Sequence, residues 1–424
     1  MLVLLALCAM FPLAAAETHP PPTAAPAPLA PAAAPVLPRR DALPAARVSA
    51  AIADYNRWLG EIAAKNDVAG LATAIVVDGK VRYQRTLGYA DTATGARVTP
   101  DTVFRLASLS KAFASALTGL LVQDGLLKWD TRISQAVPFF MLKNAVDARE
   151  ATVADILSQR SGLPRNTYDN LLEENQPYQE LARKLDEVDM ICPVGACYSY
   201  QNIAFALIGD VVYAATGDFF YHQVEKRLFL PLGMKTATYG RDALEHSASW
   251  ARPHYRRGDR WVPFLPKEAF YRVPPAAGVN ASLDDMEKWL IAQMGYRPYV
   301  LSPRLLATLH TPLVETPSER WATPWRRARL KNAQYALGWR VYDYAGDTLI
   351  FHAGAVQGYR AMIGFLPRYG IGMVILWNCD SPTPAGLMPM LLDRLLNLPH
   401  QDWAGLHARP APRRHRVRRM RHRH

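Results

Sequence analysis

The stretch FRLASLSKAF, residues 104–113, places a serine and a lysine three positions apart at the start of an apolar run. Positions three apart share one face of a helix, so the Ser108 hydroxyl and the Lys111 amine are predicted to meet there. A serine becomes an effective nucleophile when a neighbouring base takes its proton, and apolar surroundings favour the neutral lysine that can do so. Because about one such pair is expected by chance in a chain of this length, further evidence is needed.

A tyrosine and an asparagine two positions apart form the second candidate group. Tyr200-Gln201-Asn202 leads into the apolar run IAFALIG, so we expect it to begin a buried helix. Cationic neighbours could hold Tyr200 as a phenolate, a second candidate base, while the Asn202 amide could bind a substrate carbonyl and tether Lys111. Tyr168-Asp169-Asn170 has the same spacing, but it runs into a polar stretch with little apolar packing to fix it, and we reject it on that ground.

The third candidate group is His352-Ala353-Gly354, at the end of a β-rich segment and followed by Ala355. Glycine at 354 permits a close approach to the backbone, and we expect the amides of Ser108 and Ala355 to form an oxyanion hole. His352, Gly354 and Asn202 are the predicted substrate-binding residues. An unperturbed histidine titrates near ~6.5, so a substrate-facing His352 would lose its charge as the pH rises.

In order and spacing, the three groups resemble the motifs of the class C β-lactamase family, which includes penicillin-binding peptidases and esterases of the same fold. The resemblance extends from about residue 50 to 395, and three further segments carry it: 152–164, 231–234 and 278–285. It implies a serine hydrolase that forms an acyl-enzyme on Ser108, with Lys111 and Tyr200 as the other catalytic residues.

Two departures from the family pattern bear on the substrate. The β-lactamases of this family usually present Lys-Thr-Gly where this chain has His352-Ala353-Gly354. Since a lysine and a hydroxyl there help to hold the substrate carboxylate, esterase or D-amino-acid peptidase activity is expected rather than strong β-lactam turnover. The second departure is a pair of cysteines, Cys192 and Cys197, where the family commonly has an uncrosslinked Pro-Gly turn.

Other functions are less well supported. The sequence contains no Gly-x-Ser-x-Gly elbow, no His-Glu-x-x-His zinc site and no phosphate-binding Gly-x-x-x-x-Gly-Lys, so we expect no metal and no cofactor. The expected partner is a small-molecule or peptidoglycan-derived substrate, and no nucleic acid is expected. The alternative from another class is a non-catalytic, penicillin-binding or peptidoglycan-associated envelope protein. Intact Ser108, Lys111 and Tyr200 count against it, because a pure binder has no need of all three.

Hydrophobic periodicity predicts an α+β fold. Residues 46–66 have helical spacing, and Asp78-Gly79 is a favoured hairpin turn between strands at 71–77 and 81–87. Further strands are expected late in the chain, at 349–352, 361–366 and 372–377. We therefore expect one antiparallel sheet flanked by helices within a hydrolase domain at 47–400, interrupted by a mainly helical insertion at about 125–275.

The two ends of the chain have different compositions from this domain. Residues 1–16 carry no charge and end in three alanines, which is typical of a secretory signal, and residues 17–46 contain nine prolines, which favours an extended linker. Of the net charge of +12, residues 401–424 supply +7 from eight arginines and one aspartate. We expect this segment to be a disordered tail that contacts an anionic envelope surface.

We expect the protein to be exported to the bacterial periplasm, where the oxidising environment allows disulfides to persist. Pro193-Val194-Gly195-Ala196 separates Cys192 from Cys197, and a turn there could bring the two α-carbons within bridging distance. Two buried thiols are the alternative. Cys379 would be left unpaired.

Overall fold

The computed structural model describes residues 41–407. The predicted signal at 1–16, residues 17–40 of the predicted linker and residues 408–424 of the predicted tail lie outside the described residues. The first residues of the predicted tail, 401–407, pack on the domain instead: Trp403 Nε1 donates to Asp393 at 2.8 Å, and Leu406 is buried. Within residues 41–407 no individual helix has the length and apolarity to cross a bilayer; Ile203–Thr216 and Phe220–Leu232, bent by 79°, meet these criteria only as a pair.

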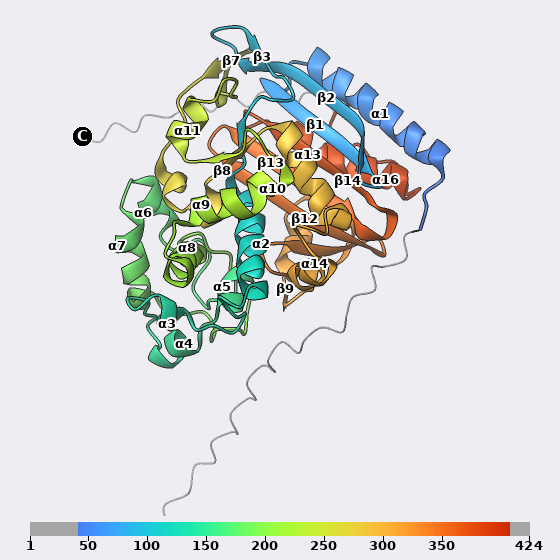
Figure 1. Cartoon of the computed structure of the whole chain (residues 1–424). Coiled ribbons are helices and arrows are strands. Elements are labelled where there is room, and N and C mark those ends of the chain that lie inside the picture. Colours follow the sequence, from blue (N-terminus) through green and yellow to red (C-terminus); the bar gives the residue numbers. More distant parts are fainter. Residues whose placement is uncertain (1–40, 408–424) are drawn as a thin grey trace, which may run out of the picture. The chain divides into compact units, whose positions relative to one another are not determined.

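A nine-stranded antiparallel sheet forms the framework, in the order β3-β2-β1-β14-β13-β12-β11-β10-β9 (Figure 1). The strands from the two ends of the chain meet in its middle, where Leu71 of β1 pairs with Trp377 of β14. The predicted turn is present, with positive φ at both Asp78 (49°) and Gly79 (70°). The strand bounds are β1 Gly70–Val77, β2 Lys80–Asp91, β3 Ala96–Arg97, β9 Val314–Glu315, β10 Leu330–Tyr335, β11 Arg340–Tyr344, β12 Asp347–Val356, β13 Tyr359–Leu366 and β14 Ile371–Trp377.

Helices cover both faces of this sheet, because successive side chains of each strand point to opposite sides. From β1, Leu71 and Ile75 pack in the core cluster that contains α1 and α16, whereas Ala72 and Ala74 pack in the cluster that contains α2 and α13. Figure 1 shows α1 and α16 on one side of the strands and α2 and α13 on the other. The bounds of these helices are α1 Ala45–Ala64, α2 Ser110–Gln123, α13 Leu283–Ile291 and α16 Leu387–Leu395, with α14 Pro303–His310 and α15 Pro324–Arg329 also near the sheet.

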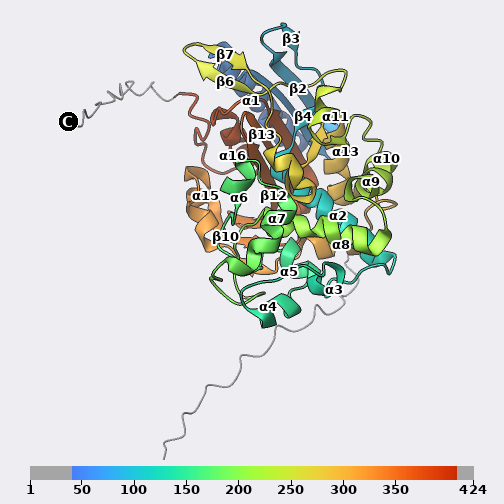
Figure 2. The same cartoon turned by 90° about the vertical axis from the view of Figure 1, so that its left-hand side faces the viewer.

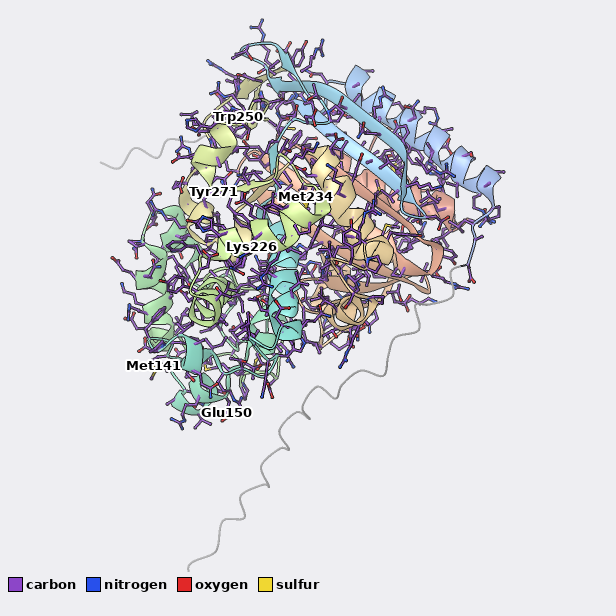
Figure 3. All side chains as sticks on the ribbon, viewed as in Figure 1. Met141, Glu150, Lys226, Met234, Trp250 and Tyr271 are labelled. Carbon is purple, nitrogen blue, oxygen red and sulfur yellow. A yellow bond between two sulfur atoms is a disulfide. The ribbon has the colours of Figure 1, made fainter. Side chains whose placement is uncertain are left out.

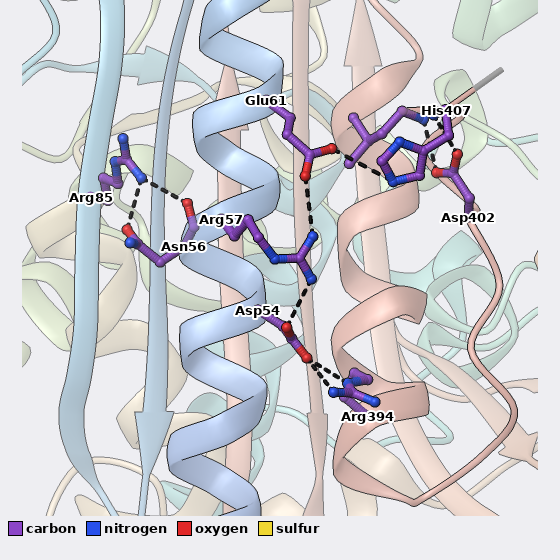
Figure 4. A network of polar contacts seen from close by, with 9 residues as sticks. Asp54, Asn56, Arg57, Glu61, Arg85, Arg394, Asp402 and His407 are labelled. Carbon is purple, nitrogen blue, oxygen red and sulfur yellow. Dashed lines mark hydrogen bonds and ion pairs between the residues drawn. The ribbon is translucent and has the colours of Figure 1, made fainter. Parts of the chain in front are cut away.

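A network of ion pairs joins α1 to α16 at the surface (Figure 4). Asp54 accepts from Arg57 at 2.8 Å and from Arg394 of α16 at 2.5 Å, and Arg57 also pairs with Glu61 at 3.2 Å. Since these groups are partly exposed, each pair contributes at most about 1 kcal/mol. Burial of the apolar faces of the two helices is therefore the main reason that they pack together.

The segment between α2 and β8 is mainly helical, as the sequence predicts. Met141 and Glu150 lie at its α3–α4 end, and Trp250 lies near α11 (Figures 2 and 3). Its short strand β5 joins a small sheet in the order β4-β8-β5, and β6 and β7 form a hairpin. The bounds are β4 Phe104–Arg105, α3 Ile133–Ala136, α4 Ala145–Glu150, α5 Val153–Leu157, α6 Asp169–Glu173, α7 Tyr178–Arg183, α8 Ile203–Thr216, α9 Phe220–Val224, α10 Leu230–Leu232, β5 Thr238–Tyr239, α11 Arg241–Glu245, β6 His254–Arg257, β7 Arg260–Pro263, α12 Pro274–Ala277 and β8 Val279–Ala281.

The structure differs from the sequence prediction at the far side of the sheet. Strands β10 and β11 were not predicted, and β12 runs from Asp347 to Val356 rather than ending at His352. His352 and Gly354 therefore lie inside a strand, paired with Ile363 and Ala361 of β13. Glycine at 354 masked this continuation, because an isolated glycine weakens a strand pattern.

Candidate active site

Ser108 lies in a short 3-10 helix, Ala107–Leu109 (η1), that joins β4 to α2. Ala107 has a φ of 49°, in the left-handed region that costs a non-glycine residue on the order of 1–3 kcal/mol. Both Ala107 and Leu109 are buried at 1% exposure, whereas Ser108 is half-buried. The sharp turn thus holds the Ser108 side chain outward between two residues anchored in the core.

Lys111 occupies the first turn of α2 and is completely buried. Its Nζ lies 2.7 Å from Asn202 Oδ1, 3.1 Å from the Ala276 carbonyl oxygen and 3.5 Å from Ser108 Oγ. A neutral amine that donates its two N–H bonds to Asn202 and Ala276 keeps its lone pair for the Ser108 hydroxyl. In this geometry a neutral Lys111 could act as a general base toward Ser108.

Burial also lowers the pKa of Lys111, to about 7. Desolvation is the largest cause, the Arg340 guanidinium adds to it, and the Asp169 carboxylate opposes it. Near neutral pH a large fraction of Lys111 is therefore neutral. The neutral form is the one that can accept the Ser108 proton.

Tyr200 is buried beside Lys111, whose Nζ lies 4.6 Å from the centre of the tyrosine ring. Its hydroxyl interacts with Ser108, and this contact and the Arg340 charge both favour the phenolate. Desolvation outweighs them and raises the pKa of Tyr200 above its usual 10. Burial thus favours the neutral phenol over the phenolate considered from the sequence, and a neutral Tyr200 can donate or relay a proton.

Asn202 lies immediately before α8 and links two charged residues. Its Oδ1 accepts from Lys111, the tether expected from the sequence, and its Nδ2 donates to Asp169 Oδ2 at 2.8 Å. Asp169 belongs to the Tyr-x-Asn triplet that the sequence analysis rejected. Tyr200 and Asn202 lie beside Lys111, as the choice of their triplet requires. However, the rejected triplet contains Asp169, whose carboxylate also reaches the site through Asn202.

Gly354 brings β12 against the turn that carries Ser108. A Cβ at position 354 would lie 2.1 Å from the Leu106 carbonyl oxygen and 3.1 Å from the Ser108 nitrogen, so only glycine fits. The next residue, Ala355, is exposed. The backbone at 354–355 therefore runs close to the Ser108 amide, where the predicted oxyanion hole would lie.

Replacing Gly354 by alanine is expected to lower the acylation rate by about 100-fold, because the added carbon must push β12 away from Ser108. Gly60→Ala is the matched control, since a Cβ at this position in α1 meets nothing within 4 Å and alanine favours a helix. Reaction with an active-site label, measured beside thermal unfolding, checks both variants. A Gly354→Ala protein that reacts at the wild-type rate would show that the close approach is unimportant.

His352 does not meet the expectation of a titrating, substrate-facing charge. It is 0% exposed, its Nε2 lies 3.2 Å from the Tyr335 hydroxyl, and its Nδ1 lies 3.0 Å from the Ala353 carbonyl oxygen. Desolvation, reinforced by the charges of Arg340 and Lys111, holds the pKa of His352 well below 6.5. Burial therefore favours the neutral imidazole at His352. The sequence could not show this, because it does not reveal burial.

Arg340, on β11, is a charged residue near the site that the sequence analysis missed. Its guanidinium lies 5.8 Å from the centre of the Tyr200 ring, and its Nη1 lies 2.8 Å from Glu319 Oε1. Both residues are less than 10% exposed. Arg340 thus places a paired positive charge behind Tyr200, and it was missed because β11 itself was not predicted.

The predicted disulfide is present between Cys192 and Cys197, whose α-carbons are 6.3 Å apart. In the described part of the chain Cys379 is a free, buried thiol. The crosslinked loop is fixed to the preceding segment, because Gly195 N donates to the Arg160 carbonyl and Ser199 N to the Gln159 carbonyl. The chain then enters Tyr200, so the disulfide constrains the approach to a candidate catalytic residue.

Replacing both Cys192 and Cys197 by serine is expected to reduce stability by about 2 kcal/mol and to lower kcat/KM, because the loop before Tyr200 loses its crosslink. A reductant should lower the activity of the wild type but leave that of the double variant unchanged. Mass spectrometry of a non-reduced digest reports the bond directly. Two free thiols in protein recovered from an oxidising compartment would contradict the assignment.

Comparison with known proteins agrees with the fold and these motifs. The Beta-lactamase family model matches residues 60–396, most of the chain, and the protein belongs to this family.

Among its relatives, the unguisins hydrolase ungD' of Aspergillus campestris is 26% identical over an alignment of 348 residues that covers 78% of this chain and 63% of that protein. Penicillin-binding protein 4 of Amycolatopsis lactamdurans is 26% identical over 336 residues, covering 77% and 85%. This chain thus spans somewhat less than two thirds of the length of the unguisins hydrolase. The names of the unguisins hydrolases among these relatives support the assignment of this protein as a hydrolase.

Solved structures show the same fold. The octameric penicillin-binding protein homologue from Pyrococcus abyssi superposes with a TM-score of 0.71 at 21% identity, covering 84% of this chain and 80% of that one. SurE superposes with a TM-score of 0.65, also at 21% identity, covering 84% and 78%. At this level of identity the likeness concerns the fold alone.

Proposed function

We propose that the protein is a serine hydrolase that acts through an acyl-enzyme on Ser108. The observation that carries this proposal is the buried Lys111, whose Nζ has Asn202 and Ala276 as hydrogen-bond acceptors and faces Ser108 Oγ at 3.5 Å. A buried lysine with its pKa near neutrality has little value for stability, because a charge removed from water must be compensated. Its value lies in accepting a proton.

The reaction has two halves. In the first, Lys111 accepts the Ser108 proton as Oγ bonds to the substrate carbonyl carbon, and the amides of Ser108 and Ala355 stabilise the oxyanion. The bond to the leaving group then breaks, and that group receives a proton relayed from Lys111 through the Tyr200 phenol. In the second half Lys111, neutral again, accepts a proton from a water molecule as the water oxygen attacks the acyl carbon. The bond between that carbon and Ser108 Oγ then breaks, and Lys111 passes the proton to Oγ as the acid is released.

The proposed substrates are esters and D-amino-acid peptides or amides, ahead of β-lactams. His352 occupies the position of the β-lactamase lysine, and it is neutral and buried, so it offers no cation to a substrate carboxylate. The names of the relatives, an unguisins hydrolase and a penicillin-binding protein, are compatible with this range. Hydrolysis of a panel containing a neutral ester, a D-amino-acid amide and a penicillin, compared as kcat/KM, tests the order.

We also propose that the protein works outside the cytoplasm. The disulfide between Cys192 and Cys197 supports this location, since such bonds are rare where glutathione and thioredoxin keep thiols reduced. Fractionation of the native host, followed by blotting for the protein, tests it.

The pH dependence should follow Lys111. Because burial lowers its pKa to about 7, the amine is protonated and inactive below that pH and neutral above it. We therefore expect kcat/KM for a neutral ester to rise about tenfold per pH unit below pH 7 and to level off above it. A profile that is flat down to pH 5 would show that another group removes the Ser108 proton.

A further inference from the structure

We infer that Asp169 is a positioning residue that orients Asn202 toward Lys111 and supplies a negative charge balancing the Lys111 ammonium, a role that rests on the proposed function. Asp169 is the first residue of α6, 33 positions before Asn202 in the chain. It contacts neither Ser108 nor Lys111 by a hydrogen bond. Its influence passes through the Asn202 amide and through space.

The orienting role follows from the chemistry of the two ends of Asn202. Its Oδ1 accepts from Lys111 Nζ at 2.7 Å, and its Nδ2 donates to Asp169 Oδ2 at 2.8 Å. An ionised carboxylate only accepts hydrogen bonds, and an ammonium only donates them. Turning the amide over would set oxygen against oxygen and nitrogen against nitrogen. The carboxylate therefore selects the one orientation in which Asn202 holds Lys111.

The electrostatic role follows from the way in which Asp169 is buried. Its Oδ1 is buried and has no hydrogen-bond partner among residues 41–407, so part of its charge is not compensated by local donors. Desolvation, to which the Glu173 carboxylate adds, raises the pKa of Asp169, while the Asn202 hydrogen bond and the charge of Lys111 oppose the rise. Each charge thus stabilises the other across the Asn202 amide.

Groups from several elements act on Lys111, and their charges differ. Asp169 of α6 is negative, Arg340 of β11 is positive and paired with Glu319, and Tyr200 and His352 are neutral at pH 7. The pKa of Lys111 is therefore set by burial and by the opposition of Asp169 and Arg340. Removing the Asp169 charge takes away the carboxylate that favours the Lys111 ammonium, while the Arg340 charge that disfavours it remains, so the neutral amine persists to lower pH.

Two substitutions separate the charge from the orientation. Asp169→Asn keeps an oxygen that can accept from Asn202 but removes the charge. We expect the acid limb of its pH profile to move down by about one unit, with the high-pH rate within about threefold of wild type. Asp169→Ala removes both, and its high-pH rate should also fall by at least about tenfold, because Asn202 loses the partner that fixes it.

The measurement is the second-order rate of covalent labelling by a neutral fluorophosphonate between pH 5 and pH 9, which requires no knowledge of the substrate. Asp186→Asn is the matched control, since it removes an equal charge from an exposed site in the segment Lys184–Glu187 and should leave the profile unchanged. Thermal unfolding establishes that each variant is folded. If Asp169→Ala does not fold, the near-isosteric Asp169→Asn alone decides.

An acid limb that stays in place, or moves up, in Asp169→Asn would overturn the inference. So would a folded Asp169→Ala protein with the wild-type high-pH rate. Failure of the proposed function looks different, because the wild type itself would then not react at Ser108.

Discussion

Ser108→Ala is expected to abolish covalent labelling and to reduce hydrolysis by at least about 10⁴-fold, because alanine has no oxygen to form the acyl-enzyme. The fold should persist. Ser108 is half-buried, and its hydroxyl contacts the site residues Lys111 and Tyr200 rather than the core. The unfolding temperature of the variant should therefore stay close to that of the wild type.

Turnover of a neutral ester and labelling by a fluorophosphonate measure this effect. Ser318→Ala is the control, because Ser318 is exposed in the segment Pro317–Trp321. If Ser108→Ala retains the wild-type labelling rate, Ser108 is not the nucleophile, and the proposed mechanism is wrong.

Lys111→Ala should lower the acylation rate by about 10³-fold or more, since the coupled acid–base unit loses the group that accepts the proton. Lys111→Arg should be almost as slow, although it retains a cation, because a guanidinium is not deprotonated in this pH range. The arginine variant separates loss of the base from loss of the charge. Both rates follow from the time course of labelling at pH 8.

Lys331→Ala is the control for this pair, since Lys331 is an exposed residue of β10. Thermal unfolding should accompany the kinetics, because removing Lys111 leaves Asn202 Oδ1 and the Ala276 carbonyl without their donor. Near-normal acylation in both Lys111 variants would mean that the proton leaves Ser108 by another route.

The parts of the fold and of the site that could be predicted from the sequence are mostly those fixed by local spacing. Ser108 and Lys111 are three positions apart, and the Asp78-Gly79 turn needs two adjacent residues with positive φ. The meeting of early and late strands could also be predicted, because strands occur at both ends of the domain with helices between them. These features follow from residue spacing and turn preferences, which can be read directly from the sequence.

The parts that it missed depend on the tertiary fold. Asp169 reaches Asn202 across 33 positions, and Arg340 reaches Tyr200 from a strand that carries no clear alternating pattern. The protonation states were also beyond reach, because burial raises the pKa of Tyr200 and lowers that of His352. The sequence does not show which titratable side chains become buried, and burial is what shifts these pKa values.

The most direct test of the central claim is to locate the covalent adduct. After reaction with a fluorophosphonate, trypsin should release residues 106–111, a peptide that contains both Ser108 and Ser110. Ser110 is fully buried, and its hydroxyl donates to the Ala107 carbonyl at 2.6 Å and accepts from Val279 N at 3.0 Å. Fragmentation by tandem mass spectrometry is therefore predicted to place one adduct per chain on Ser108. An adduct on any other residue, or none under conditions in which the folded protein hydrolyses an ester, would contradict the proposed acyl-enzyme.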